Sequence, residues 1–134
     1  MSGAANIKYV NSLHCFSDDS LCEITVEGTY TKGLIDTGAD ISIMDREFSR
    51  LLKLEPINNS AKLIREASGG LLKQYGTIRV NMQINEDTFC TDFIVVDKCH
   101  PNVILGMDFL KREKATINCG KKNFRYSFSK RRIF

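Results

Sequence analysis

The feature that most constrains this chain is a carboxylate placed at a turn between two apolar segments. Gly33, Leu34 and Ile35 lead into Asp36, and residues 41–44, Ile-Ser-Ile-Met, lead away from it. Both flanks have the apolar character of buried strands, so the acidic side chain between them carries a desolvation cost. A chain keeps such a cost where the carboxylate has a chemical role. The sequence therefore predicts a strand–turn–strand unit with a functional acid, Asp36, at its apex.

The residues that follow the acid, Thr37, Gly38 and Ala39, complete the string Asp-Thr-Gly-Ala. This string resembles the active-site motif of aspartic proteases. With Asp40 after the alanine, it is similar to the retroviral and retrotransposon branch of that class, the retropepsins. An Asp-Thr-Gly triplet is a weak motif on its own, so its meaning depends on the rest of the chain.

A second motif, Val-Ile-Leu-Gly-Met-Asp-Phe-Leu, occupies residues 103–110. It resembles the Ile-Leu-Gly-x-Asp-Phe-Leu segment of gypsy-type retrotransposon proteases and of cellular retropepsin-like proteins of the DNA-damage-inducible type. Between the motifs, the Ser-Gly-Gly of residues 68–70 separates two extended arms, which predicts a hairpin over residues 62–73. The resemblance covers residues 21–128. The structural residues that it implies beside the active-site turn are Ile104, Leu105 and Gly106.

Length and periodicity define the expected fold. The chain has 134 residues, 43% of them apolar, which suffices for one domain with one core. Many short strands and one clear helix favour an all-β, barrel-like domain. The resemblance makes this specific: a small closed retropepsin-like (acid protease) barrel with one short helix, active as a symmetric homodimer. We expect one domain over residues 1–134, with a core over about 6–128 and a basic tail at 129–134.

Local patterns predict individual elements. Asp45 is expected to cap a short helix, Gly76 to mark a bulge or bend, and Asp108 to cap the helix after Gly106 rather than to act in catalysis. Apolar alternation and short apolar runs predict strands over residues 6–10, 21–27, 30–35, 77–84, 88–96, 103–105, 115–119 and 123–128.

The resemblance implies a half-site enzyme, an aspartic endopeptidase that needs a second copy of itself. The chain has one Asp-Thr-Gly motif, whereas the chemistry needs two carboxylates. An identical chain is therefore the expected partner, and the two Asp36 side chains would share one proton. The ionised carboxylate would activate a water and the protonated one would donate to the scissile carbonyl, so neither a cofactor nor a metal is expected.

The resemblance also assigns roles around the acid. Thr37 should hydrogen-bond across the dimer, Gly38 should let the substrate backbone approach, and Ala39 should keep the pocket small. Asp40 is expected to bind the main chain of an extended polypeptide substrate. The residues of the candidate flap, which would close over that peptide, are Ser68, Gly69 and Gly70.

Two features stay open at the level of sequence. Retroviral enzymes commonly carry an arginine after the glycine of the second motif, where it pairs with the acid that corresponds to Asp40. Met107 stands there instead, which leaves the partner of Asp40 undefined. The strands of the dimer sheet are also open: residues 115–128 are the first candidate and residues 6–10 the second.

Composition argues against several other classes. The net charge is +3 with acids and bases mixed along the chain, which argues against a nucleic-acid partner. No run of 18 apolar residues predicts a membrane span, and residues 1–10 lack the pattern of a signal peptide. The five cysteines form no Cys-x-x-Cys, which favours reduced thiols and an intracellular location, in the cytoplasm or a virus-like particle, rather than secretion.

Two alternatives accompany the protease hypothesis, and the hypothesis itself allows two biological settings. A zinc site from His14-Cys15 and Cys99-His100 is disfavoured because neighbours on a strand point to opposite faces. A catalytically silent retropepsin-like dimerisation or peptide-binding module would have no need of the Asp36 carboxylate. Processing of a retroelement Gag-Pol polyprotein and service as a domesticated host protease share the same chemistry, so the sequence leaves both open.

Overall fold

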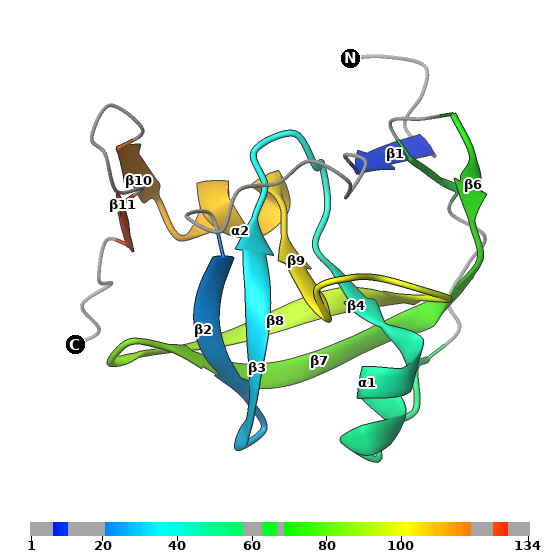
Figure 1. Cartoon of the computed structure of the whole chain (residues 1–134), viewed down its shortest axis with the longest axis horizontal. Coiled ribbons are helices and arrows are strands. Elements are labelled where there is room, and N and C mark those ends of the chain that lie inside the picture. Colours follow the sequence, from blue (N-terminus) through cyan, green and yellow to red (C-terminus); the bar gives the residue numbers. More distant parts are fainter. Residues whose placement is uncertain (1–6, 11–20, 58–62, 67–68, 119–124, 129–134) are drawn as a thin grey trace.

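Six strands form a closed barrel in the order β2–β3–β9–β4–β8–β7 (Figure 1). The structure is a computed structural model, which describes residues 7–10, 21–57, 63–66, 69–118 and 125–128. The barrel strands are β2 (Leu21–Val26), β3 (Thr29–Ile35), β4 (Ile43–Asp45), β7 (Gln74–Ile84), β8 (Asp87–Val96) and β9 (Val103–Leu105). The predicted all-β class and its closed barrel are confirmed.

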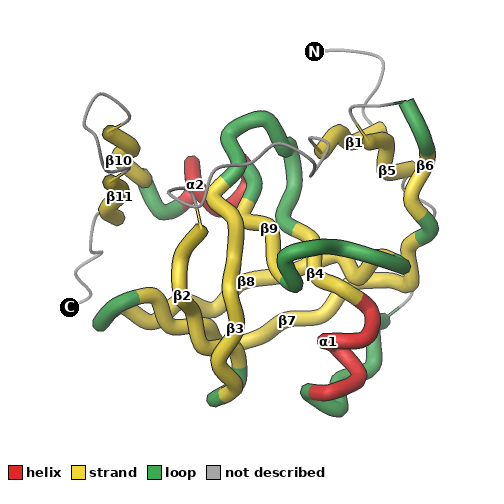
Figure 2. The backbone as a smooth tube through the Cα atoms, in the orientation of Figure 1, coloured by secondary structure: helices red, strands yellow, loops and turns green. Residues whose placement is uncertain are grey.

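Two smaller sheets and two helices complete the described chain. The predicted hairpin is present, and a third strand joins it to make a sheet in the order β1–β5–β6. Among the described strands, β10 and β11 pair only with each other. Figure 2 shows the two small sheets on opposite sides of the view, with the barrel between them. These elements are β1 (Ile7–Val10), β5 (Leu63–Glu66), β6 (Leu71–Leu72), β10 (Ala115–Asn118), β11 (Arg125–Phe128), α1 (Arg46–Leu51) and α2 (Met107–Arg112). Neither described helix is long enough to cross a membrane.

The longest strand, β7, shows how alternation fixes one face of the barrel. Its apolar residues Ile78, Val80, Met82 and Ile84 are all buried, as their period of two predicts. The register against β8 shifts next to Gly76, whose φ of 122° is open to glycine and strained for other residues. The predicted bulge is therefore confirmed.

Aromatic packing anchors the C-terminal hairpin to the barrel. Phe109 of α2 lies edge-to-face against Phe89 of β8, with ring centroids 5.1 Å apart. Phe128 of β11 meets both rings, at 5.3 Å from Phe89 and 5.5 Å from Phe109. Because such ring pairs add to the gain from burial, the three phenylalanines hold β11 against α2 and β8.

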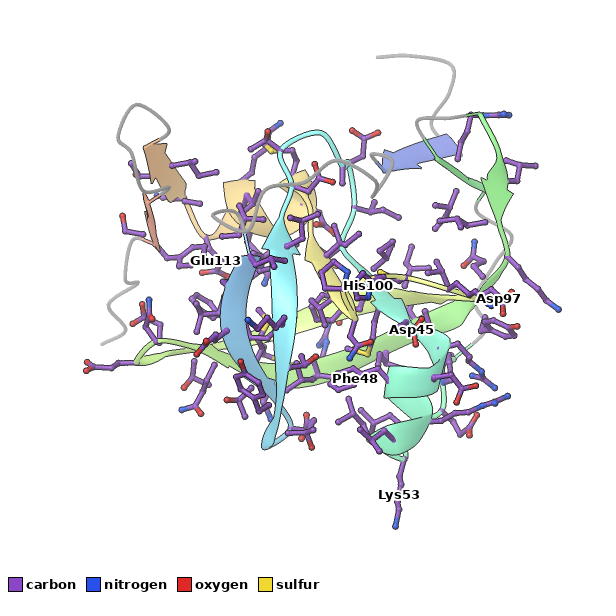
Figure 3. All side chains as sticks on the ribbon, viewed as in Figure 1. Asp45, Phe48, Lys53, Asp97, His100 and Glu113 are labelled. Carbon is purple, nitrogen blue, oxygen red and sulfur yellow. The ribbon has the colours of Figure 1, made fainter. Side chains whose placement is uncertain are left out.

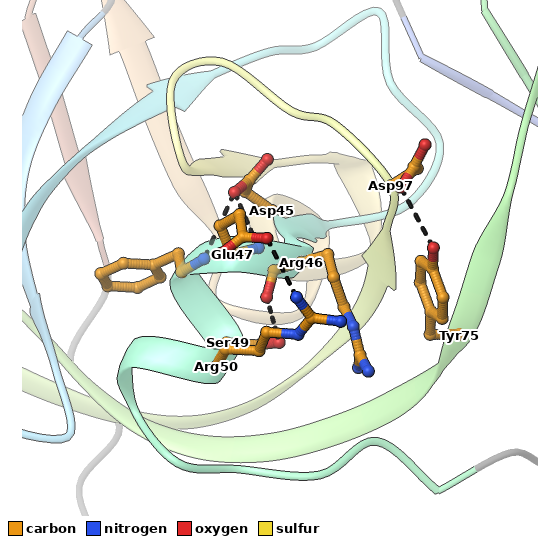
Figure 4. Close-up of polar contacts among 8 residues, drawn as sticks. Asp45, Arg46, Glu47, Ser49, Arg50, Tyr75 and Asp97 are labelled. Atoms are coloured by element: carbon orange, nitrogen blue, oxygen red, sulfur yellow. Dashed lines mark hydrogen bonds and ion pairs between the residues drawn. The ribbon is translucent and has the colours of Figure 1, made fainter.

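Asp45 ends β4 and begins α1, as predicted. One carboxylate oxygen accepts the N–H groups of Glu47 (3.0 Å) and Phe48 (3.3 Å), which have no partner within the helix (Figure 4). Its other oxygen accepts the Cys99 N–H at 2.8 Å, from the loop that follows β8. Phe48 is buried, and Figure 3 shows Lys53 directed away from the barrel beyond α1. One side chain thus fixes both the helix start and a distant loop.

Substitution of Asp45 by alanine is expected to lower the free energy of unfolding by about 2 kcal/mol, because the helix loses its cap and the Cys99 N–H its acceptor. Chemical denaturation measures the change. Asp45→Ser is the matched control, since serine also caps a helix and should recover about half of the loss. Equal stability of the alanine variant and the unaltered chain would contradict this role.

Candidate active site

The acid lies where β3 ends, and the second motif holds it there. β3 and β9 run parallel, with Leu34 opposite Ile104 and Ile35 opposite Leu105. The Asp36 N–H donates to the Leu105 carbonyl oxygen at 3.0 Å, one step beyond the last strand pair. The two sequence motifs, far apart along the chain, are therefore adjacent strands in the fold.

The turn after Asp36 is closed by the acid itself. The Gly38 N–H donates to an Asp36 carboxylate oxygen at 2.9 Å, and the Ala39 N–H donates to the Asp36 carbonyl oxygen at 3.1 Å. Asp36 is 5% exposed and Ala39 is fully buried, whereas Thr37 and Gly38 are exposed. The carboxylate is thus held in place at the base of a turn whose tip faces outward.

Strand β9 also holds the far side of the active-site loop, which we define as residues 36–42. β4, the strand that leaves this loop, pairs antiparallel with β9, with Ile43 opposite Ile104. β9 therefore lies between β3 and β4 and fixes both ends of the loop. In Figure 1 the loop rises above the barrel as the cyan segment beyond the end of β3.

Gly106 permits the loop and α2 to meet. A Cβ atom at this position would lie 2.9 Å from the Ala39 carbonyl oxygen and 2.6 Å from the Ile41 carbonyl carbon. Both neighbours are backbone, which cannot rotate away. The Met107 N–H donates to the same Ala39 oxygen at 2.7 Å, so the close approach is used for a hydrogen bond.

A buried hydroxyl and a carboxylate complete this contact. The Ser42 hydroxyl donates to one Asp108 oxygen at 2.6 Å, and the Ser42 N–H donates to the other at 3.1 Å. The Ser42 hydroxyl oxygen also accepts the Gly106 N–H at 2.9 Å. Ser42 is 1% exposed, so its polar atoms depend on these protein partners.

The structure corrects part of the role expected for Asp108. Gly106 is the N-cap of α2, without a side-chain cap, and Asp108 lies in the first turn, where one carboxylate oxygen accepts the Phe109 N–H at 2.6 Å. The same carboxylate also accepts the Ser42 hydroxyl, a partner outside the helix. Sequence reasoning missed this pair because it considered Asp108 only with its own helix. The available signal was Ser42, a hydroxyl inside an otherwise apolar segment, since a buried polar group requires a partner.

The candidate flap is the hairpin of β5 and β6. Ile64 pairs with Leu72 and Arg65 with Leu71, and the Arg65 guanidinium donates to the Gly69 carbonyl oxygen at 2.9 Å. Gly69 has a φ of 103°, and both Gly69 and Gly70 are exposed. Ser68, the third predicted flap residue, lies outside the described residues.

The base of this hairpin packs on the active-site loop. The Ile64 side chain is fully buried, in an apolar cluster that includes Ala39 and Ile41 of the loop. Tyr75, the first aromatic residue after the hairpin, is directed away from the flap: its hydroxyl donates to Asp97 at 3.1 Å and its ring faces Arg46, beside α1 (Figure 4). It therefore supports the barrel at the side of α1.

A hollow of about 280 Å³ lies beside Thr37, which forms part of its lining. Its walls come from α2 and β10 and include Met107, Leu110, Ala115 and Ile117. The exposed tip of the active-site loop and the C-terminal hairpin therefore border one largely apolar depression.

The described residues contain no group of three or more His, Cys, Asp or Glu side chains that could hold a metal ion. The Cys99 thiol donates to the Pro101 carbonyl oxygen at 3.1 Å, and burial raises its pKa above the usual range, assisted by the nearby Asp45 carboxylate. A metal ligand must be a thiolate, so this environment disfavours ligation. His14 and Cys15, the other half of the zinc hypothesis, lie outside the described residues.

A closed six-stranded barrel carries an Asp-Thr-Gly turn between β3 and β4, with β9 paired to both strands and a glycine-tipped hairpin packed beside the turn. These features define a retropepsin-like aspartic protease domain. The chain belongs to the family described as "gag-polyprotein putative aspartyl protease", whose model matches residues 22–112. The predicted family is thereby confirmed.

Curated relatives fall into two groups. The chain is 29% identical over 94 residues to the Gag-Pol polyprotein of koala retrovirus. The aligned region covers 70% of this chain and 5% of that protein. It is also 28% identical over 105 residues to "Protein DDI1 homolog 1" of Mus musculus. That aligned region covers 73% of this chain and 24% of the relative. The chain thus matches only a small part of the length of each relative.

Solved structures agree on the fold. The retroviral protease-like domain of Ddi1 from Leishmania major aligns with a TM-score of 0.61 at 20% identity, over 80% of this chain and 92% of that one. The EIAV protease, solved with an inhibitor, aligns with a TM-score of 0.58 at 23% identity, over 75% of this chain and 90% of that one.

Replacement of Gly106 by alanine is expected to lower the free energy of unfolding by about 3 kcal/mol, because the added methyl group overlaps backbone carbonyls that cannot move independently. Denaturant titration measures this. Gly70→Ala is the matched control, since a Cβ there meets nothing within 4 Å, and it should change stability by less than about 0.5 kcal/mol. Similar losses in both variants would refute the proposed packing constraint.

Substitution of Asp108 by alanine should lower the free energy of unfolding by about 2–3 kcal/mol, because the buried Ser42 hydroxyl and the Phe109 N–H both lose their acceptor. A double-mutant cycle with Ser42→Ala isolates the contact, and we expect a coupling energy of about 1–2 kcal/mol. Strictly additive losses would mean that the two side chains do not stabilise each other.

Proposed function

We propose that this chain is a homodimeric aspartic endopeptidase that hydrolyses peptide bonds with a water held between two Asp36 carboxylates. The observation that carries the proposal is a buried carboxylate, held by the Gly38 N–H at the base of a turn between two apolar strands, beside an exposed loop tip. A buried acid kept in such a place is typical of a catalytic group.

The chemistry follows from the pairing of two like groups. Two carboxylates that face each other at close range cannot both be ionised, so the pair holds one proton. The ionised member takes a proton from the bound water, and the protonated member donates its proton to the scissile carbonyl oxygen as the water attacks. The tetrahedral diol then collapses, and the amine leaves with a proton from the same pair.

The second copy is expected to dock where Thr37 borders the hollow. Two features support this surface. Thr37 is exposed at the loop tip, so that a symmetric partner would bring its own loop alongside, and Ala115 and Ile117 provide half-buried apolar area next to it. Within the described chain, β10 and β11 pair only with each other, which leaves strand edges available to a partner. The other sequence candidate, residues 6–10, supplies β1, whose pairing is with β5.

The substrate is expected to be an extended polypeptide held between the active-site loop and the flap. Gly38 offers an exposed backbone without a Cβ, and Asp40 is exposed on the same loop. Gly69 and Gly70 lie exposed at the tip of the hairpin that packs on this loop, with Ser68 expected beside them. Main-chain pairing would provide affinity for the peptide, and apolar side chains beside the scissile bond would determine which sequences are cleaved.

The biological substrate is proposed from the relatives. Retroviral Gag-Pol polyproteins carry a segment similar to this chain, which favours processing of such a polyprotein, in a retroelement or by a domesticated host gene. The similarity to DDI1 proteins keeps a cellular role in the proposal. In either setting we expect the protein to act inside the cell.

Asp36→Asn is expected to abolish cleavage of a mixed peptide library between acidic and neutral pH, because asparagine can neither take nor donate the required proton. Activity of the unaltered chain should rise more steeply than linearly with protein concentration, since the site exists only in the dimer. Asp92→Asn, which alters an exposed carboxylate paired with Arg79, is the matched control and should cleave normally.

Mixing the Asp36→Asn chain with the unaltered chain tests the shared site directly. Activity per unaltered chain should fall in proportion to the fraction of variant chains. The reason is that a mixed dimer has one Asp36 carboxylate, whereas the reaction needs two. No fall on mixing would point to an active monomer. A clean dimer that cleaves no peptide would support the alternative, a silent peptide-binding or dimerisation module.

A further inference from the structure

One edge of the candidate flap is covered by β1, a strand from earlier in the same chain. β5 pairs with β6 on one side and with β1 on the other, where Ile7 to Val10 lie opposite Leu63 to Glu66 in parallel register. Between these partners the chain forms β2, β3, β4 and α1, so the pairing is not part of a local hairpin. β1 is therefore an added strand on the edge of a hairpin.

This edge adjoins the active-site loop. Lys8 is opposite Ile64, and the Ile64 side chain is buried with Ala39 and Ile41 of the loop. β5 also leads toward the glycines at the tip of the hairpin. In Figure 1, β1 lies between the top of the active-site loop and the β5–β6 hairpin. An extended peptide bound between loop and flap would use the same row of backbone N–H and C=O groups on β5.

We propose that residues 7–10 occupy the substrate's place on β5, so that the N-terminal segment is an intramolecular competitor of peptide substrates. This inference rests on the proposed function, because it takes the β5 edge as the position of the substrate strand. It adds a self-occupied state to that site, in which a peptide must displace β1 before it can bind beside the loop.

The pairing is of a kind that peptides can displace. β1 has four paired residues and one neighbouring strand among those described, so few backbone hydrogen bonds must break for it to leave. Because it is tethered, it competes at a high effective concentration without being consumed. Because a substrate must first displace β1, the apparent affinity for substrate is lower, while the chemical step is unchanged.

The test uses the full chain with Lys8→Pro and Tyr9→Pro together. In a parallel ladder, consecutive residues direct their N–H groups to opposite sides, so two adjacent prolines remove whichever donor faces β5. The matched control is Ala4→Pro with Ala5→Pro, two prolines that precede the paired residues. A synthetic peptide of residues 5–12 with capped ends serves as the probe for the vacated edge.

The first measurement is hydrogen–deuterium exchange at residues 63–66, made with Asp36→Asn in every protein so that no cleavage interferes. The Lys8→Pro/Tyr9→Pro chain should exchange faster than the control, and the added peptide should restore its protection. Equal exchange in both chains would overturn the proposal, because β1 would then not protect β5.

The second measurement is steady-state cleavage of the fastest-cut library peptide with Asp36 intact. KM should fall about tenfold in the Lys8→Pro/Tyr9→Pro chain, the factor for a site that is self-occupied about 90% of the time, with kcat unchanged. An unchanged KM would refute competition even if exchange responds. If no protein cleaves while the peptide still protects only the proline variant, the protease proposal fails and occupation of the β5 edge by β1 stands.

Discussion

The contact between Ser42 and Asp108 joins two segments that meet only in the folded chain, and the position of Asp36 depends on it. The Ser42 hydroxyl donates to Asp108 at 2.6 Å and accepts the Gly106 N–H at 2.9 Å, so one buried side chain links the active-site loop to the start of α2. Asp36 itself is bonded through its N–H to Leu105, the residue before Gly106. The loop is thus fixed at its first residue by β9 and at its last residue by α2.

This arrangement holds the active-site loop without an arginine after the glycine of the second motif. With Met107 after the glycine, the side chain at that position cannot form an ion pair with the loop. The Met107 N–H donates instead to the Ala39 carbonyl oxygen at 2.7 Å, and the carboxylate of the next residue bonds to Ser42.

The sequence predicted those parts of the fold that depend on local rules. Alternation placed Ile78, Val80, Met82 and Ile84 on the inner face of β7, and Asp45 capped α1 as its position after β4 indicated. For Asp108, the local rule found the bond that its carboxylate accepts from the start of α2 but not the bond from Ser42, because that rule considers only the helix and not what lies across from it. The pairing of β1 with β5 was also beyond reach, since no local pattern specifies a parallel partner on the far side of several strands.

A protein that binds extended peptides has to keep a strand edge within reach of its active site, and such an edge also attracts unwanted strands from other chains. The β5 edge of this chain is covered by β1, a strand of four paired residues from the same chain. Under the proposed function, one segment then serves two needs: it protects the hairpin edge when no peptide is present, and it sets a threshold that a peptide must exceed. Selectivity would arise partly from that threshold, because weakly pairing peptides fail to displace β1 even where their side chains fit.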